Sequence, residues 1–105
     1  MADEKAFRRA ADEAMEELKR ELYDAEEDGS FEVEENAGAL YVVFEKPAGK
    51  FVITPNAPVQ QIWISALSTS FKLDWDPGAG AFVLPRTGES LTPLVDRLID
   101  EHRNA

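Results

Sequence analysis

Six short segments of β-forming residues follow one another between two amphipathic helical segments, and this order constrains the fold more than any other feature of the chain. Consecutive strands joined by short turns form an antiparallel meander, whose apolar face needs a covering layer. The two helices supply that layer. We therefore expect an α+β fold, a two-layer α/β sandwich of helix, six-stranded antiparallel meander and helix, in a single domain over residues 1–105.

The residue patterns place each predicted element. Apolar residues recur every three or four positions over the first 25 residues, which predicts a helix that begins near Ala2 or Asp3. A second apolar stripe predicts a helix from Ser90 or Thr92 onward, with a tail from Glu101 that frays into solvent. Segments rich in aromatic and β-branched residues, separated by Asn, Asp, Gly and Pro, predict strands over residues 31–34, 39–45, 51–54, 61–65, 71–75 and 81–84. Pro55 is expected to end the third strand, since proline lacks a ladder donor.

The charge balance limits the possible partners. The chain carries 21 acidic and 11 basic residues, a net charge of −10. It should repel nucleic acid and anionic membranes, and it suits cations or a basic surface on another protein. The alternative is that acidity only keeps a small domain soluble. The acidic N-terminal segment lacks the basic and apolar regions of a secretory signal, and no apolar run is long enough to span a bilayer. We therefore expect a cytoplasmic protein.

No catalytic motif stands out, so we expect that the protein is not an enzyme. The absence of cysteine excludes disulfides, thiolate catalysis and cysteine-bound clusters. The lone histidine, His102, lies on the expected fraying tail, where we expect a solvent-exposed residue and not a ligand or a catalytic group.

Carboxylates gather at the end of the first helix and on the strand that follows. Carboxylate oxygens are hard ligands that suit iron, Mn, Mg and Ca. Helical spacing places Glu13, Glu17, Glu21 and Asp24 in one exposed column, and Glu32 and Glu34 share one strand face. Such a ridge would bind cations weakly. The alternative is a solvated acidic face.

Trp63 is the second candidate. Its strand alternates so that Ile62 and Ile64 would face the helices, which leaves Trp63 on the open face with Gln61 and Ser65. An exposed tryptophan is a strong partner-binding anchor. The alternatives are that Trp63 packs in a small cluster over the sheet or that the register is inverted. Trp75, beside a turn, is expected to plug the core or an edge.

Three segments together resemble the frataxin family in its bacterial CyaY form. Residues 58–65, Pro-Val-Gln-Gln-Ile-Trp-Ile-Ser, resemble the family's tryptophan strand. Residues 36–40, Asn-Ala-Gly-Ala-Leu, resemble the hairpin after its first strand, and residues 86–91, Arg-Thr-Gly-Glu-Ser-Leu, the segment that opens its last helix. The chain departs from the family pattern at Arg8, Tyr23, Ser30 and Thr54-Pro55.

The resemblance implies an accessory protein that binds iron (Fe²⁺ or Fe³⁺) weakly and regulates or supplies iron–sulfur cluster assembly. It implies contact with cysteine desulfurase and the scaffold protein, in a monomer that could form iron-dependent oligomers. The expected metal-binding residues are Glu17, Glu21, Asp24, Glu26, Glu27, Asp28, Glu32 and Glu34, and the expected partner-binding residues are Gln61, Trp63 and Ser65. Two rivals stay open: a pure protein-interaction regulator of the desulfurase with incidental metal binding, and, more weakly, a ferroxidase.

Overall fold

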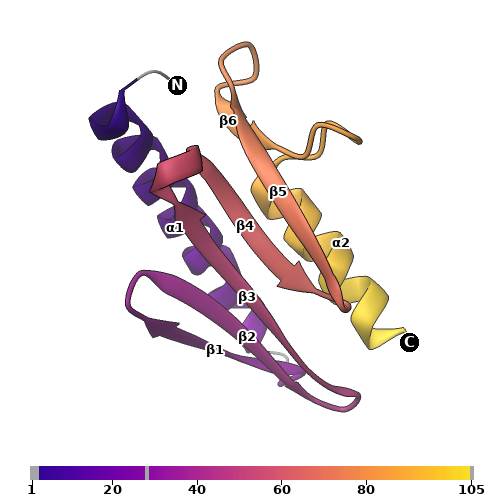
Figure 1. Cartoon of the computed structure of the whole chain (residues 1–105). Helices are drawn as coiled ribbons and strands as arrows, with labels where there is room; N and C mark the ends of the chain where they lie inside the picture. Colours follow the sequence, from indigo (N-terminus) through magenta and orange to yellow (C-terminus); the bar gives the residue numbers. More distant parts are fainter. Residues whose placement is uncertain (1–2, 28, 105) are drawn as a thin grey trace.

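The computed structural model describes residues 3–27 and 29–104, which form two helices and one antiparallel sheet (Figure 1). The strands lie in the sheet in chain order, so every neighbour is joined by a hairpin or a short connection. The α+β sandwich predicted from the sequence is therefore confirmed. The elements are α1 Glu4–Glu26, β1 Phe31–Asn36, β2 Ala39–Glu45, β3 Ala48–Asn56, a 3₁₀ turn η1 Ala57–Val59, β4 Gln61–Ala66, β5 Thr69–Asp76, β6 Ala81–Val83 and α2 Leu91–Arg103.

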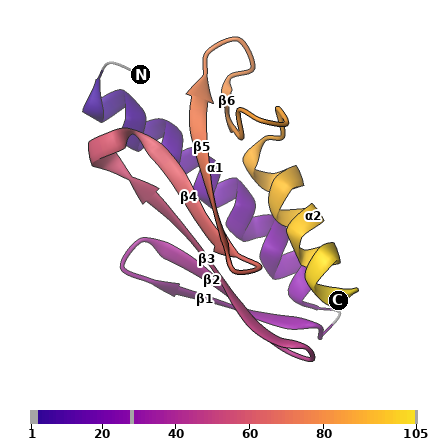
Figure 2. The same ribbon diagram turned by 45° about the vertical axis from the view of Figure 1, so that its right-hand side comes forward.

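Both helices lie against one face of the sheet and leave the other face open (Figure 2). Alternation along each strand sends one set of side chains under the helices, and Ile62 and Ile64 of β4 are 0% and 1% exposed. These isoleucines meet the apolar stripes of α1 and α2 in one core, to which Phe7, Leu18 and Leu98 contribute. The predicted strand register is thus confirmed.

Two tight hairpins fix this register. Ala37 and Gly38 join β1 to β2, and Leu67 and Ser68 join β4 to β5, all with positive φ. Two-residue loops of this kind match the right-handed twist of the flanking strands. The flanking residues therefore pair directly, as in Ala66 with Thr69.

Three expectations need correction. Pro55 does not end β3, which runs to Asn56 and pairs with β4. Because β2 pairs with β3 only as far as Ile53, the proline has no neighbour on that side and costs no ladder bond. Ser90 is the N-cap residue of α2, but its side chain makes no capping hydrogen bond. His102 does not fray, since α2 continues to Arg103.

His102 is buried against the sheet, with 9% of its surface exposed. Its ring centroid lies 4.1 Å from that of Phe44, and its Nε2 lies 2.7 Å from the carbonyl oxygen of Pro47. A side chain at Gly49 would meet this ring, because an added Cβ would come within 2.5 Å of Cε1. The histidine therefore anchors the end of α2 on the β2–β3 hairpin.

Across residues 3–27 and 29–104, neither helix has the length and apolar character needed to cross a membrane.

Candidate functional site

The flank of α1 that faces α2 carries three of the expected metal-binding carboxylates, Glu17, Glu21 and Asp24. The Glu21 carboxyl group is hydrogen-bonded to that of Asp96 on α2. This hydrogen bond, followed by burial and by repulsion from Asp96, Glu17 and Asp24, raises the pKa of Glu21 to about 7. Near neutral pH the Glu21 carboxyl group therefore carries a proton for much of the time.

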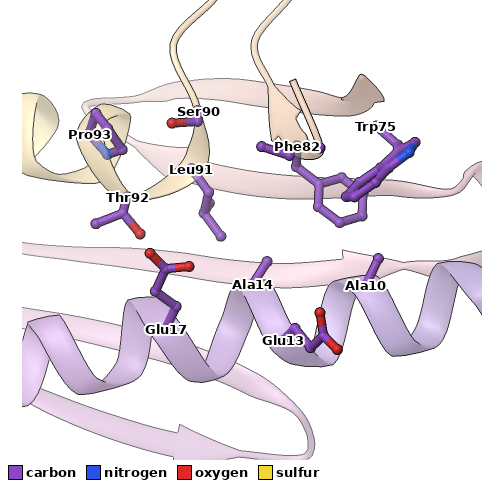
Figure 3. A pocket seen from close by; sticks show the side chains of 12 residues that line it. Ala10, Glu13, Ala14, Glu17, Trp75, Phe82, Ser90, Leu91, Thr92 and Pro93 are labelled. Carbon is purple, nitrogen blue, oxygen red and sulfur yellow. The ribbon is translucent and has the colours of Figure 1, made fainter. Parts of the chain in front are cut away.

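Glu17 lies closer to the start of α2. Figure 3 shows its carboxylate pointing toward Thr92 in the first turn of that helix. The N-terminus of a helix carries partial positive charge, and Ser90 provides no side-chain cap there. Glu17 therefore points toward the positive end of the α2 dipole.

Glu26 faces a different neighbour. It lies about two and a half helical turns beyond Glu17, on the opposite flank of α1. Its Oε2 accepts a hydrogen bond of 2.6 Å from the backbone N–H of Val33, on the outer edge of β1. One oxygen of this carboxylate therefore helps to close the sheet edge and is engaged before any cation arrives.

Glu32 and Glu34 lie on the open face of β1, opposite the buried Phe31 and Val33. Glu27 is exposed at the C-cap of α1, and the expected ligand Asp28 lies outside the described residues. The expected ridge is thus divided among the α2-facing flank, the β1-facing flank and the open sheet face. Among residues 3–27 and 29–104, no three His, Asp or Glu side chains converge in a way that could hold a metal ion.

The strongest pair of oxygen donors includes a residue that the sequence analysis missed. Asp96 follows the apolar stripe of α2 at an ordinary solvent-facing position, and only the packing of the helices brings it to Glu21. The sequence shows only that the helical spacing places Asp96 outside the apolar stripe of α2. Many surface residues share this feature, so it does not single out Asp96. The local residue pattern of neither helix indicates that Glu21 and Asp96, which are far apart in the sequence, lie next to each other.

On the open face, Trp63 lies in a row of polar side chains and is half-buried. Its indole Nε1–H donates a hydrogen bond of 2.8 Å to Gln61, and the Lys72 ammonium lies 4.9 Å from the ring centroid. Gln61 in turn donates to Asp74 at 2.8 Å. The expected partner-binding residues Gln61 and Trp63 thus belong to one hydrogen-bonded row, with Ser65 exposed beside it. Trp63 both faces outward and packs over the sheet.

A groove of about 400 Å³ lies between α1, β6 and the start of α2. Its floor is apolar, with Ala10, Ala14, Phe82 and Trp75 pointing into it, while Glu13 and Glu17 stand at its rim (Figure 3). Trp75 packs edge-on against Phe82 with ring centroids 5.3 Å apart. The expectation that Trp75 plugs the core or an edge is confirmed.

Comparisons with known proteins agree with this architecture. The family model for the frataxin-like domain matches residues 1–105. The iron–sulfur cluster assembly protein CyaY of Azotobacter vinelandii is 31% identical over 88 residues, covering 82% of this chain and 79% of the relative. The CyaY protein of Pseudomonas fluorescens strain Pf0-1 is 26% identical over 98 residues, covering 93% and 86%.

A solved structure shares the fold. Frataxin from Psychromonas ingrahamii superposes with a TM-score of 0.74 at 19% identity, covering 97% of this chain and 92% of that one. The sequence resemblance is therefore matched by a family model over the whole chain and by a relative above 30% identity. The chain belongs to the frataxin-like family.

Proposed function

We propose that this protein is an accessory factor of iron–sulfur cluster assembly that carries iron weakly on surface carboxylates and docks on the assembly machinery. Family membership and relatives described as iron–sulfur cluster assembly proteins support the proposal. The single observation that carries it is the carboxyl pair of Glu21 and Asp96, where the hydrogen bond between the two groups, burial and the surrounding negative charge raise the pKa of Glu21 to about 7. A cation can replace that proton and relieve the same repulsion.

The donor set fits a labile iron site. Carboxylate oxygens suit Fe²⁺ and other hard divalent cations, and Glu17 and Asp24 add charge on the same flank. The pair is solvent-accessible and unsupported by a third converging ligand in the described part of the chain, so binding is weak and exchange is fast. Iron is thus cargo that the protein can release. Because metal competes with the proton on Glu21, affinity rises as the pH increases through about 7 and levels off above it.

The same charges suit a basic partner surface. Glu27, Glu32 and Glu34 are exposed around the end of α1 and on β1, where they can steer a cysteine desulfurase with a basic docking site. The row of Gln61 and Trp63, with Ser65 beside it, offers an aromatic anchor for the cluster scaffold on the separate open face. The protein acts here without catalysis of its own.

The rival is a regulator that acts through protein contacts alone, with incidental metal binding. The hydrogen bond from Val33 to Glu26 gives this carboxylate a structural role without a metal, and that observation favours the alternative. Control of the desulfurase that persists in chelator-treated protein would select the rival.

The deciding experiment is an NMR titration of ¹⁵N-labelled protein with Fe²⁺ under anaerobic conditions, followed by titration with the desulfurase. We expect iron to broaden amides around Glu17–Asp24 and Asp96 first. The double variant Glu21→Gln/Asp96→Asn should lose this response, while the charge-matched control Glu45→Gln/Asp100→Asn keeps it. Broadening that is unchanged in the first variant, or absent at millimolar iron, rules out the pair as the iron site.

A further inference from the structure

The outer edge of β5 is only partly covered. β6 pairs with Asp74–Asp76 and then ends, while β5 extends back to Thr69. Beyond Val83 the chain turns away, and Ser90 returns to bridge Val83 rather than β5. Within the described chain, the backbone of residues 69–73 makes no hydrogen bond on the side away from β4.

The hairpin register shows which backbone groups are free. Ala66 and Thr69 flank a two-residue loop, so they exchange both backbone hydrogen bonds. Phe71 and Leu73 follow in the same phase and also bond to β4. Ser70 and Lys72 alternate with them, and their N–H and C=O groups therefore point to the open edge.

A groove of about 710 Å³ lies along this edge. Its apolar lining comes from Phe71, which is half-buried, and from Leu84 and Pro85 of the segment after β6. An added strand would send alternate side chains onto Phe71 on the helix side and beside Lys72 on the open side. The groove thus offers unpaired backbone N–H and C=O groups for an added strand and an apolar surface for its side chains.

The charge of this groove is opposite to that of the molecule. Its lining contains Lys72, Arg86 and Arg97 and no acidic residue, in a chain of net charge −10. Arg97 is neutralised by Glu89 at 2.6 Å and by Glu101 at 3.1 Å. Arg86 is exposed and makes no hydrogen bond or ion pair with the described residues. Lys72 likewise has no ion pair with them, and its ammonium lies over the ring of Trp63. The charge is therefore available for an acidic ligand.

The other sheet edge shows the contrast. On β1 the outward N–H of Val33 is satisfied by Glu26, so the chain supplies its own partner there. On β5 the corresponding groups of Ser70 and Lys72 have no hydrogen-bond partner among the described residues. A second copy of this chain is a poor occupant, because pairing β5 with β5 would bring two Lys72 side chains and two strongly acidic molecules together.

We propose that the open edge of β5, from Thr69 to Leu73, is a docking strand for an extended partner segment in which acidic and apolar residues alternate. The segment pairs with the free groups of Ser70 and Lys72. Its apolar residues rest on Phe71 and Leu84, and its acidic residues meet Lys72 and Arg86. This site is separate from the carboxylates of α1 and from the Gln61–Trp63 row.

The test is an NMR titration with a synthetic peptide, acetyl-Thr-Glu-Val-Glu-Val-Glu-Thr-amide, at low salt. We expect amide shifts confined to residues 69–73 and 84–87, and slower hydrogen exchange at Ser70 and Lys72. Two control peptides follow. Replacing Glu by Lys should abolish binding by charge, and N-methylation of the backbone amides that face β5 should abolish it by removing the ladder donors.

Two protein variants test the mechanism. Arg86→Glu should weaken binding about fivefold, whereas Arg20→Glu on α1 makes the same change in net charge and should leave it within about twofold. Ser70→Pro removes an outward donor without removing a bond to β4 and should abolish binding. The proposal is overturned by any of three results: no shifts at about 1 mM peptide, equal binding of the lysine peptide, or a doubled mass in sedimentation with protection of the β5 edge.

Discussion

At the scale of single residues, Glu21 shows how packing changes the chemistry of an ordinary surface carboxyl group. Alone on α1, it would ionise near its usual value. The hydrogen bond with Asp96 and the surrounding acidic groups instead raise its pKa to about 7. The folded protein therefore binds a proton more tightly than the unfolded chain does. Stability from this pair is fully present below the ordinary pKa of about 4.5 and is lost as pH rises to about 7.

The first prediction follows from this linkage. Glu21→Gln keeps a hydrogen bond to Asp96 and removes one charge. We expect it to raise the free energy of unfolding by about 1 kcal/mol at pH 8, after discounting the shift for solvent screening. It should also flatten the decline of stability between pH 4.5 and 7. Urea denaturation at several pH values measures both effects, with Glu45→Gln as control, and an undiminished decline in the variant would contradict the assignment.

Adjacent residues of β4 supply the second prediction. Ile64 is fully buried, whereas Trp63 is half-buried on the open face over Lys72. Ile64→Ala should cost about 3 kcal/mol of unfolding free energy and spare scaffold binding by the folded fraction. Trp63→Ala should cost about 1 kcal/mol and weaken scaffold binding by about 2 kcal/mol. Thermal denaturation and calorimetry with the scaffold separate the two. A reversal of the two stability costs would contradict the register.

At the scale of elements, the hydrophobic periodicity and the turn-forming residues predicted where each helix and strand lies and which of its faces is buried. The alternation around Ile62 and Ile64 placed β4 correctly, and the helical stripe of Phe7 and Leu18 placed α1. The sequence could not show contacts made between elements. The burial of His102 depends on the β2–β3 hairpin reaching α2, and Pro55 is tolerated only because β2 ends before it.

The sequence predicted which kind of residue forms the candidate site, but it did not predict how the carboxylates are arranged in space. The described carboxylates lie on α1, at its C-cap and on β1, but Glu26 at the end of α1 bonds to the edge of the sheet while Glu32 and Glu34 face the open side. Asp96 joined the site through helix packing. Local spacing specifies which residues share one element's face, and tertiary packing decides which faces meet.

The third prediction tests the docking of α2 on the hairpin. Gly49→Ala places a methyl group against the His102 ring and should lower the free energy of unfolding by about 2 kcal/mol. His102→Ala should cost about 2 kcal/mol, since it removes the ring from Phe44 and leaves the Pro47 carbonyl without its partner. In the double variant the clash is gone, so the two costs should not add. Additive costs in urea denaturation would show that the two sites are not in contact.

At the scale of the whole molecule, the net charge of −10 opposes folding through self-repulsion. Any cation relieves part of this by screening. A divalent cation that binds the folded state adds a specific stabilisation that grows with its concentration. The two effects separate when ionic strength is held constant, because screening alone depends on ionic strength and binding depends on the metal.

The last prediction uses that separation. At matched ionic strength, 5 mM Mn²⁺ in place of Na⁺ should raise the free energy of unfolding by about 1 kcal/mol, as expected for a site with a Kd near 1 mM. The variant Glu17→Gln/Glu21→Gln/Asp96→Asn should lose most of this increment. The charge-matched control Asp12→Asn/Glu45→Gln/Asp100→Asn, whose carboxylates come from three elements, should retain it. Loss of the increment in Glu32→Gln/Glu34→Gln instead would place the cation on the open face of β1. Equal increments in all four proteins would mean that Mn²⁺ acts on the general field of the molecule, and the carboxyl pair between α1 and α2 would then be a feature of stability alone.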